Sequence, residues 1–131
     1  MIGLDSNVII RYVAQDDATQ TPIATRIFES CSFDNPGFIS LVALVETVWV
    51  LRSSYETSHQ QIHRVVETLL RTRGIVVEQS ELVWMALAEF ALGTADLGDY
   101  LIECCGRAAG CEYTLTFDRD AASSPGMKLL K

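Results

Sequence analysis

Hydrophobic and polar positions follow one another in blocks that predict short strands separated by pairs of helices. Short apolar runs at MIGL, GFI and IVV have the length and composition of buried strands, and EYTLTF and MKLL predict two more. Apolar residues recur every three or four positions between these runs, which predicts helices over 7–14, from Thr21, over 41–52, from Thr57 or Ser58 to Gly74, from Ser80 to about Gly93, and from about Leu97 to Ala109. Buried strands that alternate with helices are typical of a parallel sheet covered on both faces, so we expect an α/β fold.

The same periodicity predicts which side of each helix is buried. The expected inward faces are Ile23, Ile27, Phe28 and Cys31 in one helix, and Val83, Ala86, Leu87 and Phe90 in another. Ser40 is the expected N-cap of the helix over 41–52, because its hydroxyl can accept from a free backbone N–H of the first turn.

Composition limits the class of protein. The chain has 131 residues, 49% hydrophobic and 21% charged, which predicts one globular domain over 1–131. The longest apolar stretch, ISLVALVETVWVL, contains Glu46 and is too short for a bilayer, and MIGLDSNVII lacks the basic leader of a secretory signal, so we expect a cytoplasmic protein with no membrane partner. The four cysteines form no C-x-x-C pair; we expect free core thiols, with neither a zinc site nor a disulfide framework.

Charge argues against a broad nucleic-acid-binding surface. The net charge is −7, and such a surface requires an excess of Lys and Arg. Arg11, Arg52, Arg107 and Arg119 are candidates for contacts with phosphate, and each has the alternative of an ordinary surface residue. A nucleic-acid partner therefore requires something that offsets the acids locally.

Acidic residues stand where a parallel sheet forms its sites. Asp5 follows the first strand and Asp118 follows TLTF, and ligands bind beyond the carboxyl ends of parallel strands. Glu46 has only apolar neighbours three and four positions away, which predicts a partly desolvated carboxylate unless this side of the helix faces solvent. Asp96 and Asp99 begin an apolar helix. The alternative for the aspartates is that they only cap helices or complement a helix dipole.

Clustered carboxylates need a cation. Two like charges 4 Å apart repel by about 4 kcal/mol at an effective dielectric constant near 20, so either some acids stay protonated or a cation lies among them. An all-oxygen ligand set favours Mg²⁺ or Mn²⁺, and these ions support hydrolysis of phosphodiesters. The sequence therefore predicts a metal-dependent phosphodiesterase site.

Four segments resemble a known family. LDSNVIIRYV, the Glu within the apolar helix, ADLGDYLIECC and TLTFDRD resemble, in order and spacing, the PIN-domain ribonucleases, especially the VapC toxins of toxin–antitoxin pairs. The resemblance implies a three-layer fold with a central parallel sheet of four to five strands and helices on both faces. It also implies cleavage of RNA with Mg²⁺ or Mn²⁺, a cognate antitoxin and a homodimer. The metal-binding and catalytic acids that it implies are Asp5, Glu46, Asp99 and Asp118, with Ser6, Asn7, Asp96, Thr116 and Asp120 as accessory residues. It leaves open whether Asp118 or Asp120 is the fourth ligand.

Two other functions remain open at this point. A phosphatase or phosphoryl-acceptor domain would use Asp5 as its nucleophile, but that class favours a second Asp where Asn7 stands, together with a Lys near the phosphate. A PIN-like binding module without activity would not need all four acids.

Overall fold

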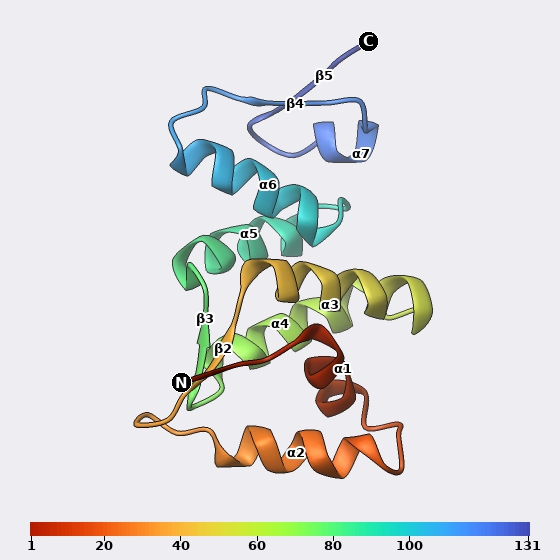
Figure 1. Cartoon of the computed structure of the whole chain (residues 1–131). Coiled ribbons are helices and arrows are strands. Elements are labelled where there is room, and N and C mark those ends of the chain that lie inside the picture. Colours follow the sequence, from red (N-terminus) through yellow and green to blue (C-terminus); the bar gives the residue numbers. More distant parts are fainter. The chain divides into compact units, whose positions relative to one another are not determined.

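The structure, a computed structural model, describes all residues 1–131 and divides into two compact units, Met1–Ser80 and Glu81–Lys131. Figure 1 shows the order of the helices and strands along the chain. Each unit is described by itself.

The first unit is a parallel three-stranded sheet with four helices. Its elements are β1 (Ile2–Gly3), α1 (Ser6–Ala14), α2 (Gln20–Ser30), β2 (Gly37–Ile39), α3 (Leu41–Ser54), α4 (His59–Arg71) and β3 (Ile75–Val77). The strand order is β1-β2-β3, and both pairs are parallel. Because the chain moves across this sheet in one direction, right-handed crossovers place both helix pairs on one face. Burial agrees, since Ile75 and Val77 are buried whereas Val76 between them is exposed.

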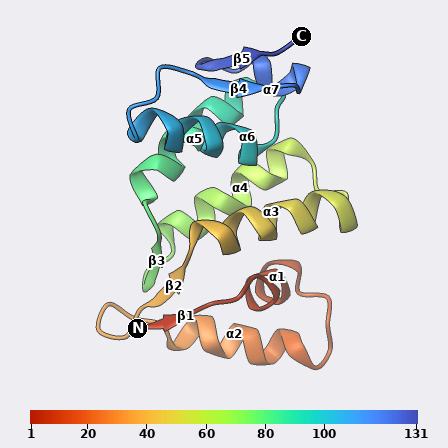
Figure 2. The ribbon, with the colours of Figure 1, turned by 45° about the horizontal axis from the view of Figure 1, so that its top comes forward.

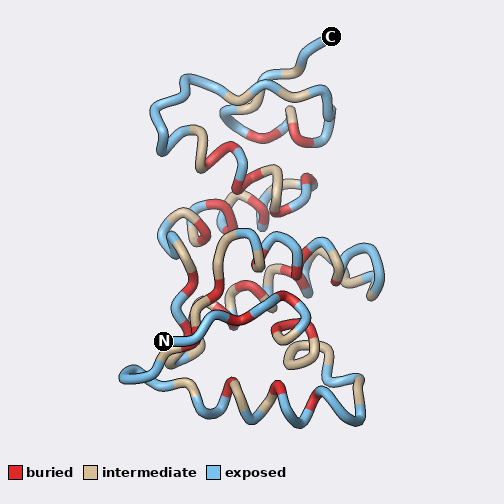
Figure 3. Tube along the Cα trace, in the orientation of Figure 1, coloured by how far each residue is buried: buried red, intermediate tan, exposed pale blue.

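The helices of the first unit pack around one apolar core. α1 contacts α2 and α3, and α4 contacts α3 and β3 (Figures 1 and 2). The rings of Tyr12 and Phe28 stack in parallel with their centroids 3.9 Å apart, which joins α1 to α2. Buried positions recur along the inner faces of these helices (Figure 3) and include Ile9, Leu44, Leu51, Ile62, Val66 and Leu69. Ile39 at the end of β2 is buried as well.

The predicted face of α2 is partly wrong. The helix buries Thr21, Ala24 and Phe28, whereas Ile23 is 49% exposed. The helix also begins earlier than the Thr21-Pro22 pair predicts, at Gln20. The reason is that the Asp17 side chain accepts from the backbone N–H groups of Thr19 and Gln20 at 2.9 and 2.6 Å, and so caps the helix from outside.

Two serine caps fix the helices that follow β2. The Ser40 hydroxyl accepts from the N–H of Ala43, which confirms the predicted cap of α3. At α4 the cap is Ser58, not Thr57: its hydroxyl accepts from the N–H of Gln61, and the Gln61 side chain accepts from the N–H of Ser58. This reciprocal pair is a capping box.

The second unit contains a helix pair and a two-stranded parallel sheet. Apart from Ser80, α5 (Ser80–Leu92) belongs to it, followed by α6 (Leu97–Ala108), β4 (Thr114–Thr116), α7 (Arg119–Ala122) and β5 (Met127–Leu129). The predicted inward face of α5 is confirmed at all four positions. Phe90 of α5 meets Tyr100 of α6 edge to face, with ring centroids 6.2 Å apart. The short helix α7 was not predicted.

The α/β class and the parallel direction of the strands are confirmed. The hydrogen bonds join the five strands as a set of three and a set of two, where the sequence predicted one sheet. Every strand has only two or three residues, so each pair exchanges few hydrogen bonds, and Ile2 and Gly3 of β1 are exposed where MIGL predicted burial. None of the helices combines the length and hydropathy that a membrane span requires.

Candidate metal-binding acids

Asp5 and Glu46 meet at one buried hydroxyl in the first unit. Asp5 ends the segment after β1 and caps α1, where its Oδ1 accepts from the N–H of Ser6 at 2.7 Å. The hydroxyl of Ser6, a residue only 5% exposed, donates a short hydrogen bond to Glu46 Oε1 and lies 3.4 Å from Asp5 Oδ1. Since a hydroxyl has one proton, it can fully satisfy only one of the two carboxylates. Three of the nine predicted site residues are therefore adjacent.

The prediction that Glu46 is desolvated by its own helix is wrong. Glu46 is exposed, and two of its apolar neighbours are exposed too, Val42 at 77% and Trp49 at 67%. The helix α3 is apolar nearly all round, so its sequence cannot show which side is buried. Its buried side consists of Leu44, Thr47, Val48 and Leu51.

Asn7 lies at the side of this cluster. Its side chain is exposed and lines a groove of about 490 Å³ together with residues of α1 and α2, among them Val8, Ile23 and Ile27. A larger pocket of about 680 Å³ lies between the C-terminal half of α1, α3 and α4, and it contains none of the predicted site residues.

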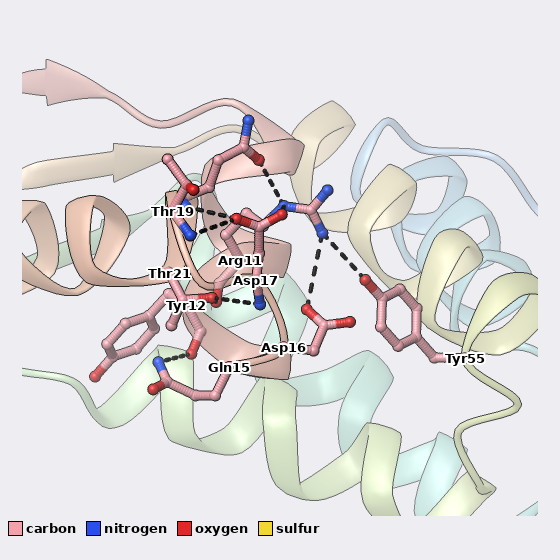
Figure 4. Close-up of polar contacts among 9 residues, drawn as sticks. Arg11, Tyr12, Gln15, Asp16, Asp17, Thr19, Thr21 and Tyr55 are labelled. Atoms are coloured by element: carbon pink, nitrogen blue, oxygen red, sulfur yellow. Dashed lines mark hydrogen bonds and ion pairs between the residues drawn. The ribbon is translucent and has the colours of Figure 1, made fainter.

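Arg11 is not available for phosphate in this conformation. Its guanidinium donates to Gln20 Oε1 at 2.6 Å and to the Tyr55 hydroxyl at 3.3 Å (Figure 4). The carboxylates of Asp16 and Asp17 lie 3.8 and 4.0 Å away. Arg11 instead joins the turn after α1 to the end of α3.

Four predicted acids belong to the second unit. Asp118 caps α7: its Oδ1 accepts from the N–H groups of Asp120 and Ala121 at 2.8 and 3.2 Å. The Thr116 hydroxyl at the end of β4 accepts from the N–H of Asp118 at 3.0 Å. Asp96 occupies the N-cap position of α6, but its side chain makes no capping hydrogen bond, contrary to the cap interpretation.

Asp99, in the first turn of α6, has a raised pKa, and perturbed pKa values are common at functional sites. Burial is the largest cause that raises its pKa, and a backbone hydrogen bond from Asp96 opposes this effect. The charges of Asp118, Asp96 and Asp120 raise the pKa further. Partial burial and the neighbouring acids together therefore penalise the charged form of Asp99. A bound cation would reverse that penalty.

The donor chemistry of the predicted acids suits a hard cation. Within each unit the side chains consist of carboxylates with a hydroxyl beside them, Ser6 in the first and Thr116 in the second. Oxygen ligands of this kind are those that Mg²⁺ and Mn²⁺ prefer. The residues therefore fit the predicted metal.

A different acidic cluster was missed from the sequence. Glu89, Glu103 and Cys104 have potential ligand atoms within 4.8 Å of one another. The Arg107 guanidinium already neutralises this group, with Nη2 2.5 Å from Glu103 Oε1 and 3.2 Å from Glu89 Oε1. Arg107 is thus an ion-pair partner, not a free phosphate ligand. The reasoning applied to Glu46, a Glu whose neighbours three and four positions away are all apolar, would have identified Glu89. It would not have identified Glu103, which has Asp99 and Arg107 at these positions.

The cysteines are free, as predicted, but they are not all core thiols. Cys104 is buried, Cys31 and Cys105 are half-buried, and Cys111 is exposed. Burial, followed by the charge of Glu89, raises the pKa of the Cys104 thiol to about 11.

Comparisons with known proteins point to one family. No curated protein matches the chain. Among solved structures, the chain is similar to the crystal structure of Mycobacterium tuberculosis VapC20, a toxin that cleaves the sarcin–ricin loop, with 17% identity, 94% of each chain covered and a TM-score of 0.45. The family model of the PIN domain matches residues 2–125, which include all nine predicted site residues. The chain therefore belongs to the PIN domain family.

Proposed function

We propose that this chain is a metal-dependent endoribonuclease in which Asp5, Glu46, Asp99 and Asp118 hold Mg²⁺ or Mn²⁺. The observation that carries the proposal is the PIN domain match over residues 2–125, which spans all four acids. The raised pKa of Asp99 supports it, because an acid that is costly to ionise alone gains most from a cation.

We propose further that the two units act as one PIN domain. The family match extends across both Met1–Ser80 and Glu81–Lys131 up to residue 125. Asp5 and Glu46 come from the first unit, and Asp99 and Asp118 come from the second.

The residues of the chain have separate tasks in this proposal. A bound Mg²⁺ or Mn²⁺ would supply Lewis-acid stabilisation of the charge on a phosphodiester. Ser6 donates to Glu46 and fixes the orientation of that carboxylate beside Asp5. Thr116 accepts from the N–H of Asp118 and holds the start of the loop. Asp96 and Asp120 add negative charge near Asp99, and Asn7 provides an amide at the side of the first-unit acids.

We propose a toxin–antitoxin context for this activity. The opening LDSNVIIRYV and the later motifs support a VapC-like toxin, which acts in the cytoplasm on RNA as a homodimer and is held inactive by a cognate antitoxin. With a net charge of −7, the acidic site favours a partner segment that places an Arg among the carboxylates, since its guanidinium can bind two carboxylates at once. An antitoxin complex with undiminished nuclease activity would contradict this mode of inhibition.

The nuclease activity can be tested directly. Purified protein is incubated with structured RNA in Mn²⁺, in Mg²⁺ and in EDTA, and the products are resolved on a denaturing gel. We expect cleavage with either ion, none in EDTA, and a loss of at least about 100-fold in Asp5→Asn. Release of phosphate from a generic phosphomonoester without RNA cleavage would instead favour the phosphatase.

Variants of the α7 loop assign the fourth ligand. Asp118→Asn and Asp120→Asn are assayed side by side, each with a Mn²⁺ titration. We expect Asp118→Asn to weaken Mn²⁺ binding more than Asp120→Asn does. The opposite order would move the ligand role to Asp120.

A further inference from the structure

Glu103 is a buried carboxylate with a partner of fixed geometry. It is 3% exposed, and Arg107, one turn later on α6, grips both of its oxygens: Nη2 lies 2.5 Å from Oε1, and Nε lies 3.2 Å from Oε2. The same Nη2 donates to Glu89 on α5 at 3.2 Å. These hydrogen bonds raise the pKa of Arg107, so the guanidinium stays charged. The two-point grip fixes the Glu103 side chain more narrowly than a single contact does.

The turn before β5 rests on this carboxylate. A Cβ built on Gly126 would lie 2.5 Å from Glu103 Oε2 and 2.6 Å from its Cδ, so no side chain fits there. Gly126 also has a φ of +86°, which L residues rarely adopt. The backbone of the turn therefore packs directly on the Glu103 side chain.

The pair lies on α6, which also carries Asp99, and Glu103 contacts the turn at Gly126 that follows α7, the helix capped by Asp118. Asp99 precedes Glu103 by one helical turn, about 6 Å along α6. Asp118 caps the single turn of α7, and the chain then passes through Ser124, whose N–H donates to Ala121 at 3.0 Å, to Gly126. A displacement of Glu103 would therefore move Gly126, and this movement would reach Asp118 through Ser124 and the single turn of α7.

We propose that Glu103, gripped by Arg107, is a positioning residue that sets the spacing between Asp99 and Asp118. The inference rests on the proposed function, because the spacing of the two acids matters only if both bind the same metal ion. Glu103 is buried but Arg107 is exposed, and an ion pair with an exposed partner adds little net stability, so its fixed geometry is what it contributes here. Glu103 and Arg107 are not themselves proposed to bind the metal ion.

The first test changes the pair and measures two quantities in the full chain. Glu103→Gln keeps the size but loses the charge, and Arg107→Lys keeps the charge but loses the two-point grip. Amide exchange is measured without metal at Thr114 and Met127, whose N–H groups donate to Gly126 and Ser124. Mn²⁺ affinity is measured by calorimetry. We expect about tenfold faster exchange at these two amides, unchanged exchange in α5, and about tenfold weaker Mn²⁺ binding in both variants. The control is Glu112→Gln at an exposed carboxylate, which should match the wild type.

A glycine pair provides a test that leaves both charges in place. Gly126→Ala and Gly110→Ala both force a side chain onto a positive φ, +86° and +98°, but a Cβ at Gly110 meets nothing within 4 Å. Backbone strain is common to both variants, whereas displacement of Glu103 belongs to Gly126→Ala alone. We expect only Gly126→Ala to weaken Mn²⁺ binding.

The outcomes separate this inference from the proposed function. A wild type that binds neither Mn²⁺ nor Mg²⁺ overturns the proposed function, and the positioning role with it. A wild type that binds Mn²⁺, with Glu103→Gln, Arg107→Lys and Gly126→Ala equal to it in affinity, overturns the positioning role alone. Faster exchange throughout the second unit, α5 included, would show that the pair only stabilises the fold.

Discussion

At the scale of single residues, Asp99 couples the charge of the proposed site to the stability of the fold. Its pKa is raised above the ordinary value of 3.8, first by burial and then by neighbouring acids. A carboxyl with a raised pKa binds its proton more tightly in the folded state than in the unfolded chain. Its stabilising contribution is therefore complete below pH 3.8 and is lost as the pH rises through the raised value. At neutral pH without metal, the Asp99 carboxylate destabilises the protein.

Asp99→Asn should raise the melting temperature of the metal-free protein at pH 7, because the amide removes the ionisation penalty and keeps the size of the side chain. The gain should shrink as the pH falls toward 3, where the wild-type carboxyl is protonated as well. The same variant should lose most of its nuclease activity. Thermal melts in EDTA at several pH values, with an RNA cleavage assay, check both statements.

Asp96→Asn is the matched control on the same helix. The Asp96 side chain makes no capping hydrogen bond and Asn keeps its size, so we expect little change in melting temperature and a smaller loss of activity than in Asp99→Asn. If activity instead falls more in Asp96→Asn, the metal-ligand role belongs to Asp96.

The burial of some individual side chains could not be predicted from the sequence. Glu46 has only apolar neighbours three and four positions away and is exposed, whereas Glu103 has Asp99 and Arg107 at these positions and is buried. The environment of a helix residue depends on what packs against its face, and an all-round apolar helix such as α3 does not encode that choice. The identity of the candidate acids was readable because each aspartate stands at the end of a strand or the start of a helix.

At the scale of elements, helix starts carry stability that can be measured. Ser58→Ala removes the hydroxyl of the α4 capping box and should cost about 1 kcal/mol in the free energy of unfolding. Thr57→Ala, one position earlier, should cost less than about 0.5 kcal/mol, because Thr57 has no capping role. Urea unfolding of both variants checks the difference, and equal losses would mean that the capping box does not contribute to stability.

The sequence predicted long elements better than short ones. The cap at Ser40 and the face of α5 follow from local rules and are confirmed, and of the two starts predicted for α4, Thr57 or Ser58, the cap is Ser58. The start of α2 depends on Asp17, which lies outside the helix, and the single turn of α7 is too short to show a period. Both depend on side-chain hydrogen bonds that hydrophobic patterning does not register.

At the scale of the whole molecule, the proposed metal should act as a stabilising ligand. A ligand that binds only the folded state adds about 2.7 kcal/mol when its concentration is one hundred times its dissociation constant. We therefore expect a higher melting temperature in Mn²⁺ than in EDTA, and a smaller difference in Asp5→Asn. Calorimetric scans of both proteins check this, and identical wild-type scans would count against a metal site.

The rate at which the buried Cys104 thiol reacts can report local opening of the second unit. With its pKa raised to about 11, this thiol is almost wholly protonated at neutral pH, and only the thiolate reacts with alkylating reagents. Cys111, on the loop after α6, is exposed to the solvent. A reagent such as iodoacetamide should label Cys111 promptly and Cys104 only when α5 and α6 part. The rate of the slow phase of labelling would then measure how fast this helix pair opens, without any probe being added to the protein.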